Sequence, residues 1–293
     1  MILTFVGFGE LGAAWADALR THRDLVLRAY VRTARAARQG VTLHTDLAEA
    51  LAGADVVLGC VPAGAAVAVA DGCLDDLAPD ALYVDLAPAD PEAKRILAGR
   101  MGERGVMYAD VALLGTVVVS GLQLPMLAAG PGAERWASVG SGLGMRITPI
   151  AGDAGSAAAI KLIRSVYMKG RDALVLEMLV AARAQGVEGD VIRSIGGAGE
   201  QVPFAALADR VMGALSIHAG RRADELVASA GLLRAAGVEP LVTQAAARRL
   251  QWMADLGVHE SLGERHDDAV RVLDAIDELH ARGAHTGASG LED

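Results

Sequence analysis

Short apolar runs alternate with helical patterns along the first half of the chain. The strand-like runs are Ile2–Val6, Leu25–Val31, Thr42–His44, Val56–Val61, Leu82–Leu86 and Val106–Asp110, and the helical patterns are Ala13–Thr21, Asp46–Leu51, Val67–Leu77 and Pro91–Arg104. Apolar strands separated by helices are typical of a parallel sheet covered on both faces. The pattern therefore predicts a doubly wound α/β domain. Two later apolar pieces, Val117–Val119 and Met126–Ala128, fit hairpin or edge strands.

After Pro149 long helical patterns replace the strand-like runs. They cover Ser156–Gln185, Val202–Ser216, Gly220–Ala236, Leu241–Leu256 and Asp267–Arg282, and Gly186, Gly237 and Gly257 lie where helices should end. The change of class predicts an α/β domain at residues 1–150 and an all-α domain at residues 151–285, linked by the long helix. Residues 286–293 are small and polar, and we expect them to be disordered.

Three glycines follow the first predicted strand and open the first predicted helix. They belong to the sequence Gly7-Phe8-Gly9-Glu10-Leu11-Gly12, a G-x-G-x-x-G pattern. In a dinucleotide-binding Rossmann unit the first glycine permits the tight turn, the second lets the backbone approach a pyrophosphate, and the third lets helix and strand pack closely. The diphosphate then binds the free N–H groups of the helix. Because a strand precedes this motif and a helix follows it, the motif predicts dinucleotide binding.

The end of the second predicted strand indicates which dinucleotide is bound. NAD-binding units carry an acidic residue about 20 residues beyond the glycine motif, where it binds the adenosine ribose. Here Arg32 holds that place, and Thr33 follows it. A guanidinium can bind a ribose phosphate bidentately, the Thr33 hydroxyl can donate to it, and Arg35 or Arg38 would add positive charge. The segment predicts NADP(H) rather than NAD(H), the alternative being a solvated basic helix start.

Composition and charge narrow the classes of function. Of the 293 residues, 53% are hydrophobic and 3% are aromatic, so a large core must be built from small side chains. The net charge of −9 disfavours a nucleic-acid-binding protein, which normally needs a basic face. We expect a cytoplasmic protein without a membrane partner, because no long apolar run stands out and Met1 leads directly into a strand. Cys60 and Cys73 lack metal-site spacing and are expected to be buried thiols, and no metal site is predicted.

In the order and spacing of its motifs, the chain resembles the β-hydroxyacid dehydrogenases, the group that includes 3-hydroxyisobutyrate and 6-phosphogluconate dehydrogenases. The matching segments are Gly7–Gly12, Cys60-Val61-Pro62, Asp85-Leu86-Ala87-Pro88-Ala89-Asp90-Pro91, Asp110-Val111-Ala112-Leu113-Leu114-Gly115-Thr116, and the run from Gly152 to Lys161. The resemblance implies that Val61 and Pro62 lie against the cofactor and that Lys161 is the catalytic lysine. It also implies a substrate-binding segment at Leu114, Gly115 and Thr116.

The chain departs from that family at the substrate wall. Leu114-Gly115-Thr116 replaces the family's Ser-Gly-Gly, and Ser165 stands where the family usually has asparagine. The stretch from Lys161 to Gly170, with Glu177 beyond it, is more similar to a subgroup of phosphogluconate-dehydrogenase-like proteins with a distinct helical C-terminal domain. The substrates of the better-known members therefore do not carry over. The apolar wall predicts a substrate with an apolar or bulky part.

Lys161 is the candidate general acid and base. Hydride transfer to or from a carbon that bears oxygen also requires a proton transfer, and a positioned lysine can supply and accept that proton. Lys161, Ser165 and Lys169 are spaced i, i+4 and i+8, so they fall along one side of the long helix. We expect Ser165 to orient the substrate or the lysine. Lys169 either binds an anionic group of the substrate or is a solvated surface lysine.

Three functions remain open at this point. The first is an NADP(H)-dependent oxidoreductase acting on a hydroxy or keto acid or a related small carbonyl compound. The second is reduction of C=N bonds, as in the related imine reductases, which usually have a different residue at the lysine position. The third is a non-catalytic NADP(H)-binding protein, since the Ser-Gly-Gly segment and the asparagine are lost. The resembling families form intertwined dimers through the helical domain, which implies a homodimer with its active site at the domain cleft.

Overall fold

The computed structural model of the chain describes residues 1–34, 36–195, 202–264 and 266–287. The chain divides within one long helix into two compact units, Met1–Val166 and Tyr167–Asp293. We call the first the sheet unit and the second the helical unit. The boundary near residue 150, drawn from the change in sequence pattern, stays a prediction.

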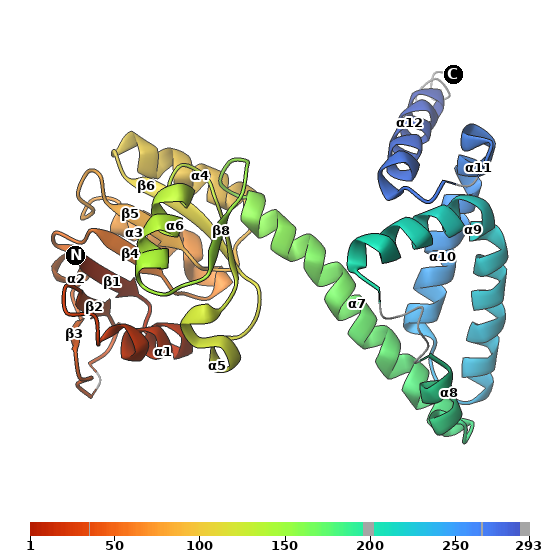
Figure 1. The fold of residues 1–293 in the computed structure, drawn as a ribbon, viewed down its shortest axis with the longest axis horizontal. Coiled ribbons are helices and arrows are strands. Elements are labelled where there is room, and N and C mark those ends of the chain that lie inside the picture. The colour runs from red at the N-terminus through yellow and green to blue at the C-terminus, as the bar shows by residue number, and fades with distance from the viewer. Residues whose placement is uncertain (35, 196–201, 265, 288–293) are drawn as a thin grey trace, which may run out of the picture. The chain divides into compact units, whose positions relative to one another are not determined.

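One mixed sheet forms the centre of the sheet unit (Figure 1). Its strands are β1 Ile2–Val6, β2 Val26–Tyr30, β3 Val41–His44, β4 Val56–Gly59, β5 Leu82–Asp85, β6 Met107–Leu113, β7 Met126–Ala129 and β8 Ile147–Pro149. Their order is β3-β2-β1-β4-β5-β6-β7-β8, and neighbours pair in parallel except β6 and β7, which pair antiparallel. This order reverses direction between β1 and β4. In open α/β sheets the crevice outside the carboxyl ends of two such strands is the usual ligand site.

Helices give the sheet an apolar core on each face. The helices of this unit are α1 Glu10–Leu19, α2 Leu47–Leu51, α3 Ala66–Cys73, α4 Pro91–Glu103, α5 Val117–Ser120, α6 Ala133–Gly142 and the first part of α7 Ser156–Ala184, with 3-10 turns η1 Ala63–Ala65 and η2 Gly121–Gln123. Trp15 of α1 and Trp136 of α6 belong to one core. Cys73 of α3 and Leu97 of α4 belong to the other. The predicted doubly wound arrangement is therefore confirmed.

The segment Val117–Val119 corrects the sequence prediction. Its three β-branched residues fit an edge strand, but they form the short helix α5, and Val118 and Val119 are exposed. A strand needs a partner, and the edge of β6 is already taken by β7. The other predicted piece, Met126–Ala128, does form a strand. Helix α6 and strand β8 were not predicted.

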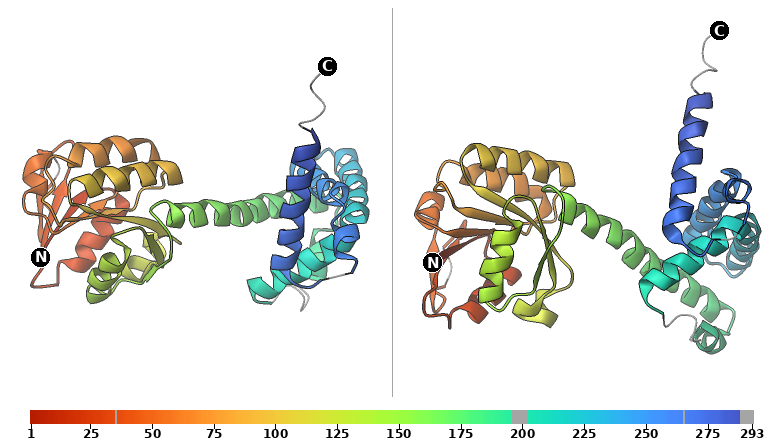
Figure 2. Two further views of the ribbon diagram at one scale, coloured as in Figure 1. Left: turned by 90° about the horizontal axis from the view of Figure 1, so that it is seen from above. Right: turned by 45° about the horizontal axis from the view of Figure 1, so that its top comes forward.

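The helical unit contains the second part of α7 and the helices that follow it. These are α8 Glu188–Ile195, α9 Phe204–Ala235, α10 Leu241–Asp255, α11 Val258–Leu262 and α12 Ala269–Gly287. Helix α9 packs along α10, and α11 and α12 close a core that contains Met253 and Val272. Figure 2 shows the helices of this unit from two further directions. Two helices were predicted where α9 lies, and the helix has non-helical backbone angles at His218, between those two segments.

The predicted helix ends agree with the backbone at three glycines. Gly186, Gly237 and Gly257 all have positive φ, a conformation that favours glycine at the end of a helix. The tail expected to be disordered, residues 286–293, lies outside the described residues apart from its first two positions, which end α12. Within the described ranges no helix combines the length and the apolar character needed to cross a membrane.

Candidate functional site

The turn between β1 and α1 has glycine at three positions with three different surroundings. Gly7 has φ +93°, and a Cβ atom there would lie 2.5 Å from the carbonyl oxygen of Cys60, beyond the end of β4. A Cβ on Gly9 would meet nothing within 4 Å, so the backbone faces open space there. A Cβ on Gly12 would lie 3.0 Å from the carbonyl oxygen of Gly7, because α1 packs closely on the turn. The surroundings of Gly7 and Gly12 agree with the tight turn and the close packing that the sequence pattern predicts, and the open space at Gly9 leaves room for the pyrophosphate whose binding stays a prediction.

The start of α1 presents free backbone donors. Gly9 is the N-cap residue and no side chain caps the helix. Glu10, in the first turn, is exposed, and Leu11 is half-buried. A helix start of this kind attracts anionic groups, since unpaired N–H groups and the helix dipole both favour negative charge.

A cavity of about 490 Å³ opens beside this helix start. It is lined by Phe8, Gly9, Glu10, Ala13, Ala36, Ala37, Arg38 and Leu43. The first four residues come from the glycine turn and α1, and the others come from the segment after β2 and from β3. The cavity thus extends from the start of α1, which can bind a diphosphate, to the end of β2, where Rossmann units hold the adenosine ribose. The residues that line it therefore fit a dinucleotide.

Arg32 and Thr33 lie just beyond β2 and are both exposed. Arg35 lies outside the described residues. Arg38 is held in place: its Nε donates to Asp17 Oδ1 at 2.8 Å, and its guanidinium carbon lies 5.7 Å from the centroid of the Phe8 ring. The sequence alone indicated only that Arg38 adds positive charge.

The end of β4 packs against the glycine turn. Cys60 donates its backbone N–H to Val6 O at 2.8 Å, and the Cγ1 atom of Val61 would lie 2.8 Å from a Cβ on Gly7. Val61 is half-buried, and Pro62, the N-cap residue of η1, is exposed. Both residues therefore lie at the carboxyl end of β4, next to the turn.

A buried charge cluster lies at the carboxyl end of β5 and in the middle of β6, and sequence reasoning gave it no role. The Nζ atom of Lys94, on α4, lies 2.9 Å from Asp110 Oδ1 and 3.4 Å from Asp85 Oδ2. Lys94 also donates to the carbonyl oxygen of Asp85 at 3.1 Å. The three side chains are at most 3% exposed. Lys94 lies in the first turn of α4, and the sequence carries no signal that this lysine is buried.

Both carboxylates of the cluster also accept hydrogen bonds from groups other than Lys94. The Tyr108 hydroxyl donates to Asp85 Oδ2 at 2.5 Å. Burial and the Asp85 carboxylate raise the pKa of Tyr108, so its hydroxyl keeps the proton that it donates. Asp110 Oδ2 accepts the backbone N–H groups of Gly155 and Ala158, at 2.9 and 3.0 Å. Asp110 therefore caps the start of α7.

Lys161 lies one turn beyond the residues that Asp110 caps. Ala157 is buried against Ala112 of β6 and Ala129 of β7. Lys161 and Ser165 follow Ala157 at intervals of four residues and are both half-buried, on the same side of α7. Lys169 continues the series, is exposed, and belongs to the helical unit.

The expected substrate segment follows directly on β6. Leu114 is half-buried and donates its backbone N–H to Pro125 O at 2.9 Å, while Gly115 and Thr116 are exposed. The loop beyond is tied to α1, because Trp15 Nε1 donates to Gly121 O at 3.1 Å. Leu114, Gly115, Thr116, Lys161 and Ser165 all lie in the sheet unit.

The cysteines are placed for packing. Cys73 is buried and Cys60 is half-buried. Burial raises the pKa of the Cys73 thiol to about 12 and raises that of Cys60 as well, so both thiols keep their protons near neutral pH. Among the residues that the structure describes, no three His, Cys, Asp or Glu side chains gather as a metal site would require.

The helical unit contains a buried carboxylate that accepts hydrogen bonds from α10. Glu177 of α7 accepts from the N–H groups of Val242 and Thr243 at 2.8 and 2.9 Å, and from the Thr243 hydroxyl at 2.6 Å. Burial alone would raise the pKa of Glu177, but these hydrogen bonds lower it below its ordinary value. Glu177 thus fixes α7 to the first turn of α10.

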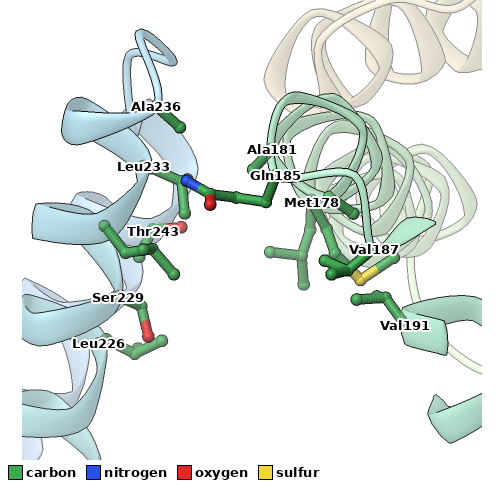
Figure 3. Close-up of a pocket in the computed structure, with 13 residues that line it drawn as sticks. Met178, Ala181, Gln185, Val187, Val191, Leu226, Ser229, Leu233, Ala236 and Thr243 are labelled. Carbon is green, nitrogen blue, oxygen red and sulfur yellow. The ribbon is translucent and has the colours of Figure 1, made fainter.

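The same unit has an apolar cavity of about 330 Å³ (Figure 3). Met178 and Ala181 of α7 line one side of it, and Leu226 and Leu233 of α9 line the other. Some of the apolar side chains that line it remain exposed, including Leu174 at 48% and Leu232 at 57%. Exposed apolar side chains gathered around a cavity can mark a binding surface.

Comparison with known proteins identifies two regions of the chain. Residues 2–139 match the family described as the NAD binding domain of 6-phosphogluconate dehydrogenase. Residues 182–253 match a domain of unknown function, DUF1932. The first match covers strands β1 to β7 and the glycine turn, and the second lies within the helical unit.

Solved structures of similar proteins agree on the fold. A conserved hypothetical protein from Sinorhizobium meliloti 1021 is 27% identical, with 95% of this chain and 96% of that chain covered and a TM-score of 0.60. A conserved protein of unknown function, described as structurally similar to 3-hydroxyacid dehydrogenases, is 26% identical over 88% of this chain and 99% of its own, with a TM-score of 0.60.

An imine reductase from Myxococcus stipitatus in complex with NADP+ is 20% identical, with 93% of this chain and 100% of that chain covered and a TM-score of 0.72. The V8 variant of that enzyme is in complex with NAD+. At this identity the likeness concerns the fold alone. The chain therefore has the fold of NAD(P)-binding oxidoreductases.

Proposed function

Because the chain joins an NAD-binding domain of the 6-phosphogluconate dehydrogenase type to a DUF1932 domain, we propose that it is an NADP(H)-dependent oxidoreductase. Its reaction is hydride transfer to or from a hydroxy or keto acid or a related carbonyl compound. The observation that carries the proposal is the glycine turn, in which Gly7 packs on Cys60 while Gly9 faces open space at the start of α1.

The chain's own residues hold the cofactor, which supplies or accepts the hydride when bound. The backbone of Gly7, Phe8, Gly9, Glu10, Leu11 and Gly12 receives the diphosphate, and Val61 and Pro62 bound the same site at the end of β4. Arg32 and Thr33 bind the ribose phosphate, with Arg35 adding charge. No acidic residue stands at the place where it would repel that phosphate, which favours NADP(H) over NAD(H).

Lys161 holds and moves the proton that accompanies hydride transfer. Its place on α7 is supported by the Asp110 cap, one turn earlier, and by the packing of Ala157 on the sheet. Ser165 orients the lysine or the substrate from the next turn. Positioned acids and bases of this kind typically contribute about 10²- to 10⁴-fold to a rate.

The substrate binds against Leu114, Gly115 and Thr116. Leu114 makes this wall apolar, while the Thr116 hydroxyl makes no capping hydrogen bond to α5 and can donate to a ligand. The arrangement suits a carbonyl compound with an apolar or bulky part better than a small polyhydroxy acid.

Reduction of C=N bonds is the second candidate, favoured by the fold that the chain shares with the imine reductase of Myxococcus stipitatus. Lys161 separates the two candidates. Lys161→Ala should abolish reduction of ketones, but it need not abolish reduction of imines, which can reach the site already protonated.

The experiment that tests the proposal has two stages. Purified protein is titrated with NADPH by calorimetry, and NADPH oxidation is then followed with a panel of keto acids, ketones and cyclic imines, for the wild type and for Lys161→Ala. Turnover of a carbonyl compound that Lys161→Ala abolishes supports the proposal. Tight NADPH binding with no turnover on the whole panel would instead identify a non-catalytic cofactor-binding protein.

The helical unit is proposed to form a homodimer. The apolar cavity between α7 and α9, together with the exposed leucines nearby, offers a surface that a second copy of the chain would cover. Light scattering of the protein at micromolar concentration measures the mass directly. A monomeric mass contradicts the dimer and leaves the proposed reaction untouched.

A further inference from the structure

Arg38 is fixed by two contacts with other elements. Its Nε donates to Asp17 Oδ1 at 2.8 Å and its Nη2 donates to Asp17 Oδ2, so the planar group is held by a two-point pair with α1. Its guanidinium carbon also lies 5.7 Å from the Phe8 centroid. Phe8 is in turn 8% exposed and packs edge-on against Phe5, at 5.9 Å between centroids. The guanidinium plane is therefore held in one orientation.

The charge of Arg38 is already compensated. The hydrogen bonds from Arg38 lower the pKa of Asp17, so this carboxylate stays ionised and paired near neutral pH. Because Asp17 engages the Nε and Nη2 donors, Arg38 cannot offer this same two-point pair to a phosphate, and the charge that would attract the phosphate is already paired. Within the described residues Arg32 has no such carboxylate partner, and it lies just beyond the end of β2.

Arg38 nevertheless lines the cavity beside the glycine turn, and its side chain is 37% exposed. The other residues on its side of the cavity are Ala36, Ala37 and Leu43. Arg38 is thus the flat, polarisable group on that side. Arginine stacks well on aromatic faces, through both cation–π attraction and its planar shape.

A diphosphate on the start of α1 directs the adenosine toward the end of β2, and so into this cavity. We propose that Arg38 is the platform on which the adenine ring stacks, whereas Arg32 reads the ribose phosphate. This inference rests on the proposed function, because it concerns the cofactor of that same site. The two arginines then have different roles. Arg38 contributes to the binding of any adenine dinucleotide, and Arg32 sets the preference for NADP(H) over NAD(H).

Titration calorimetry of the full chain tests this division with NADPH, NADH, 2′,5′-ADP and 5′-ADP. We expect Arg38→Ala to weaken all four ligands by a similar factor of about ten, the size of a stacking contact. We expect Arg32→Ala to weaken NADPH and 2′,5′-ADP while leaving NADH and 5′-ADP unchanged. Arg38→Lys keeps the charge but loses the plane, so it should not restore binding.

Arg95→Ala is the matched control, because Arg95 forms an exposed ion pair with Glu92 on α4, away from the cavity residues. Its affinities should equal those of the wild type. Melting temperatures of all variants show whether a loss of binding reflects a loss of fold, and Arg38→Lys provides a second variant if Arg38→Ala is unstable.

Two results would overturn the inference while leaving the proposed function standing. In the first, Arg38→Ala weakens only the phosphorylated ligands and Arg38→Lys restores them, which makes Arg38 a phosphate ligand. In the second, Arg38→Ala changes none of the four affinities, which makes the Asp17 pair merely structural. A wild-type chain that binds neither NADPH nor NADH overturns both the inference and the proposed function.

Discussion

The ammonium group of Lys94 lies 2.9 Å from Asp110 Oδ1 in the interior of the sheet unit, with both side chains at most 1% exposed. Lys94 also serves Asp85, so one cation is shared by two carboxylates. The two carboxylates also accept hydrogen bonds from the Tyr108 hydroxyl and from the backbone N–H groups of Gly155 and Ala158. This set of contacts connects α4, β5, β6 and the start of α7.

Lys94→Met should destabilise the protein severely. Methionine fills most of the lysine volume but leaves two buried carboxylates without a cation, and breaking a buried ion pair costs about 3–5 kcal/mol. Urea denaturation of the wild type and the variant measures the difference in free energy of unfolding. Arg95→Met, on the exposed face of the same helix, should change it by less than about 0.5 kcal/mol.

The double variant Lys94→Met/Asp110→Asn checks the cause. Since the asparagine removes one of the two charges that the lysine neutralised, the double variant should be more stable than the sum of the two single changes predicts. If the changes in free energy of unfolding of the two single variants simply add up in the double variant, the ion pair itself contributes little to stability.

The glycines of the first turn should separate folding from cofactor binding. Gly9→Ala places a methyl group in open space, so the melting temperature without cofactor should change little while the NADPH dissociation constant rises about tenfold or more. Gly7→Ala forces a side chain into a positive φ and against Cys60, so the apo protein itself should melt at a lower temperature. If Gly9→Ala binds NADPH as the wild type does, the diphosphate does not lie on this turn.

Glu177→Gln should weaken the helical unit in a pH-dependent manner. The pKa of Glu177 is lower in the folded chain than its ordinary value, so the ionised form stabilises the fold. That stabilisation, about 1–2 kcal/mol for hydrogen bonds to a charged group, is present above the ordinary carboxyl pKa and is lost as the pH falls through the folded value.

Urea denaturation at several pH values therefore provides the test for Glu177. The difference in free energy of unfolding between the wild type and Glu177→Gln should be largest near pH 7 and should disappear below about pH 4. Glu225→Gln, which removes an exposed carboxylate on α9, is the control and should leave no such gap. A gap of constant size down to acid pH would mean that the charge of Glu177 is not what holds α10.

Asp17→Asn should shift the preference between the two cofactors. The variant removes the carboxylate that engages Arg38, so the guanidinium gains free donors within the same cavity. We expect affinity for NADPH to rise severalfold relative to NADH, measured by calorimetry at fixed ionic strength. An equal change for both cofactors would show that the released charge does not reach the ribose phosphate.

The sequence predicted those elements whose signal is local. Strand β1 has the predicted ends because the apolar run from Ile2 to Val6 stops at a glycine that must turn. Helix α4 begins at the predicted Pro91, with Asp90 accepting the N–H groups of its first turn. Each of these boundaries depends on the properties of a few adjacent residues.

The failures come from contacts between distant residues. Valines at 117–119 fit a strand by propensity, but β6, the strand just before them, is already paired with β5 and β7. Strand β8 is only three residues long and ends in Pro149, which an edge strand tolerates and a sequence pattern does not show. In the candidate site, the glycine turn was predicted from its spacing. The pairing of Arg38 with Asp17 and of Lys94 with two carboxylates depends on elements that meet only in the folded chain.

The cap that Asp110 places on α7 links the start of that helix to a distant part of the chain. Asp110 belongs to β6, whereas the N–H groups that donate to it lie 45 and 48 residues further along the chain. The first turn of α7 therefore gains these bonds only where a residue of the sheet lies beside it. A peptide with the sequence of α7 alone would lack both bonds, so the start of this long helix depends on the sheet as well as on its own residues.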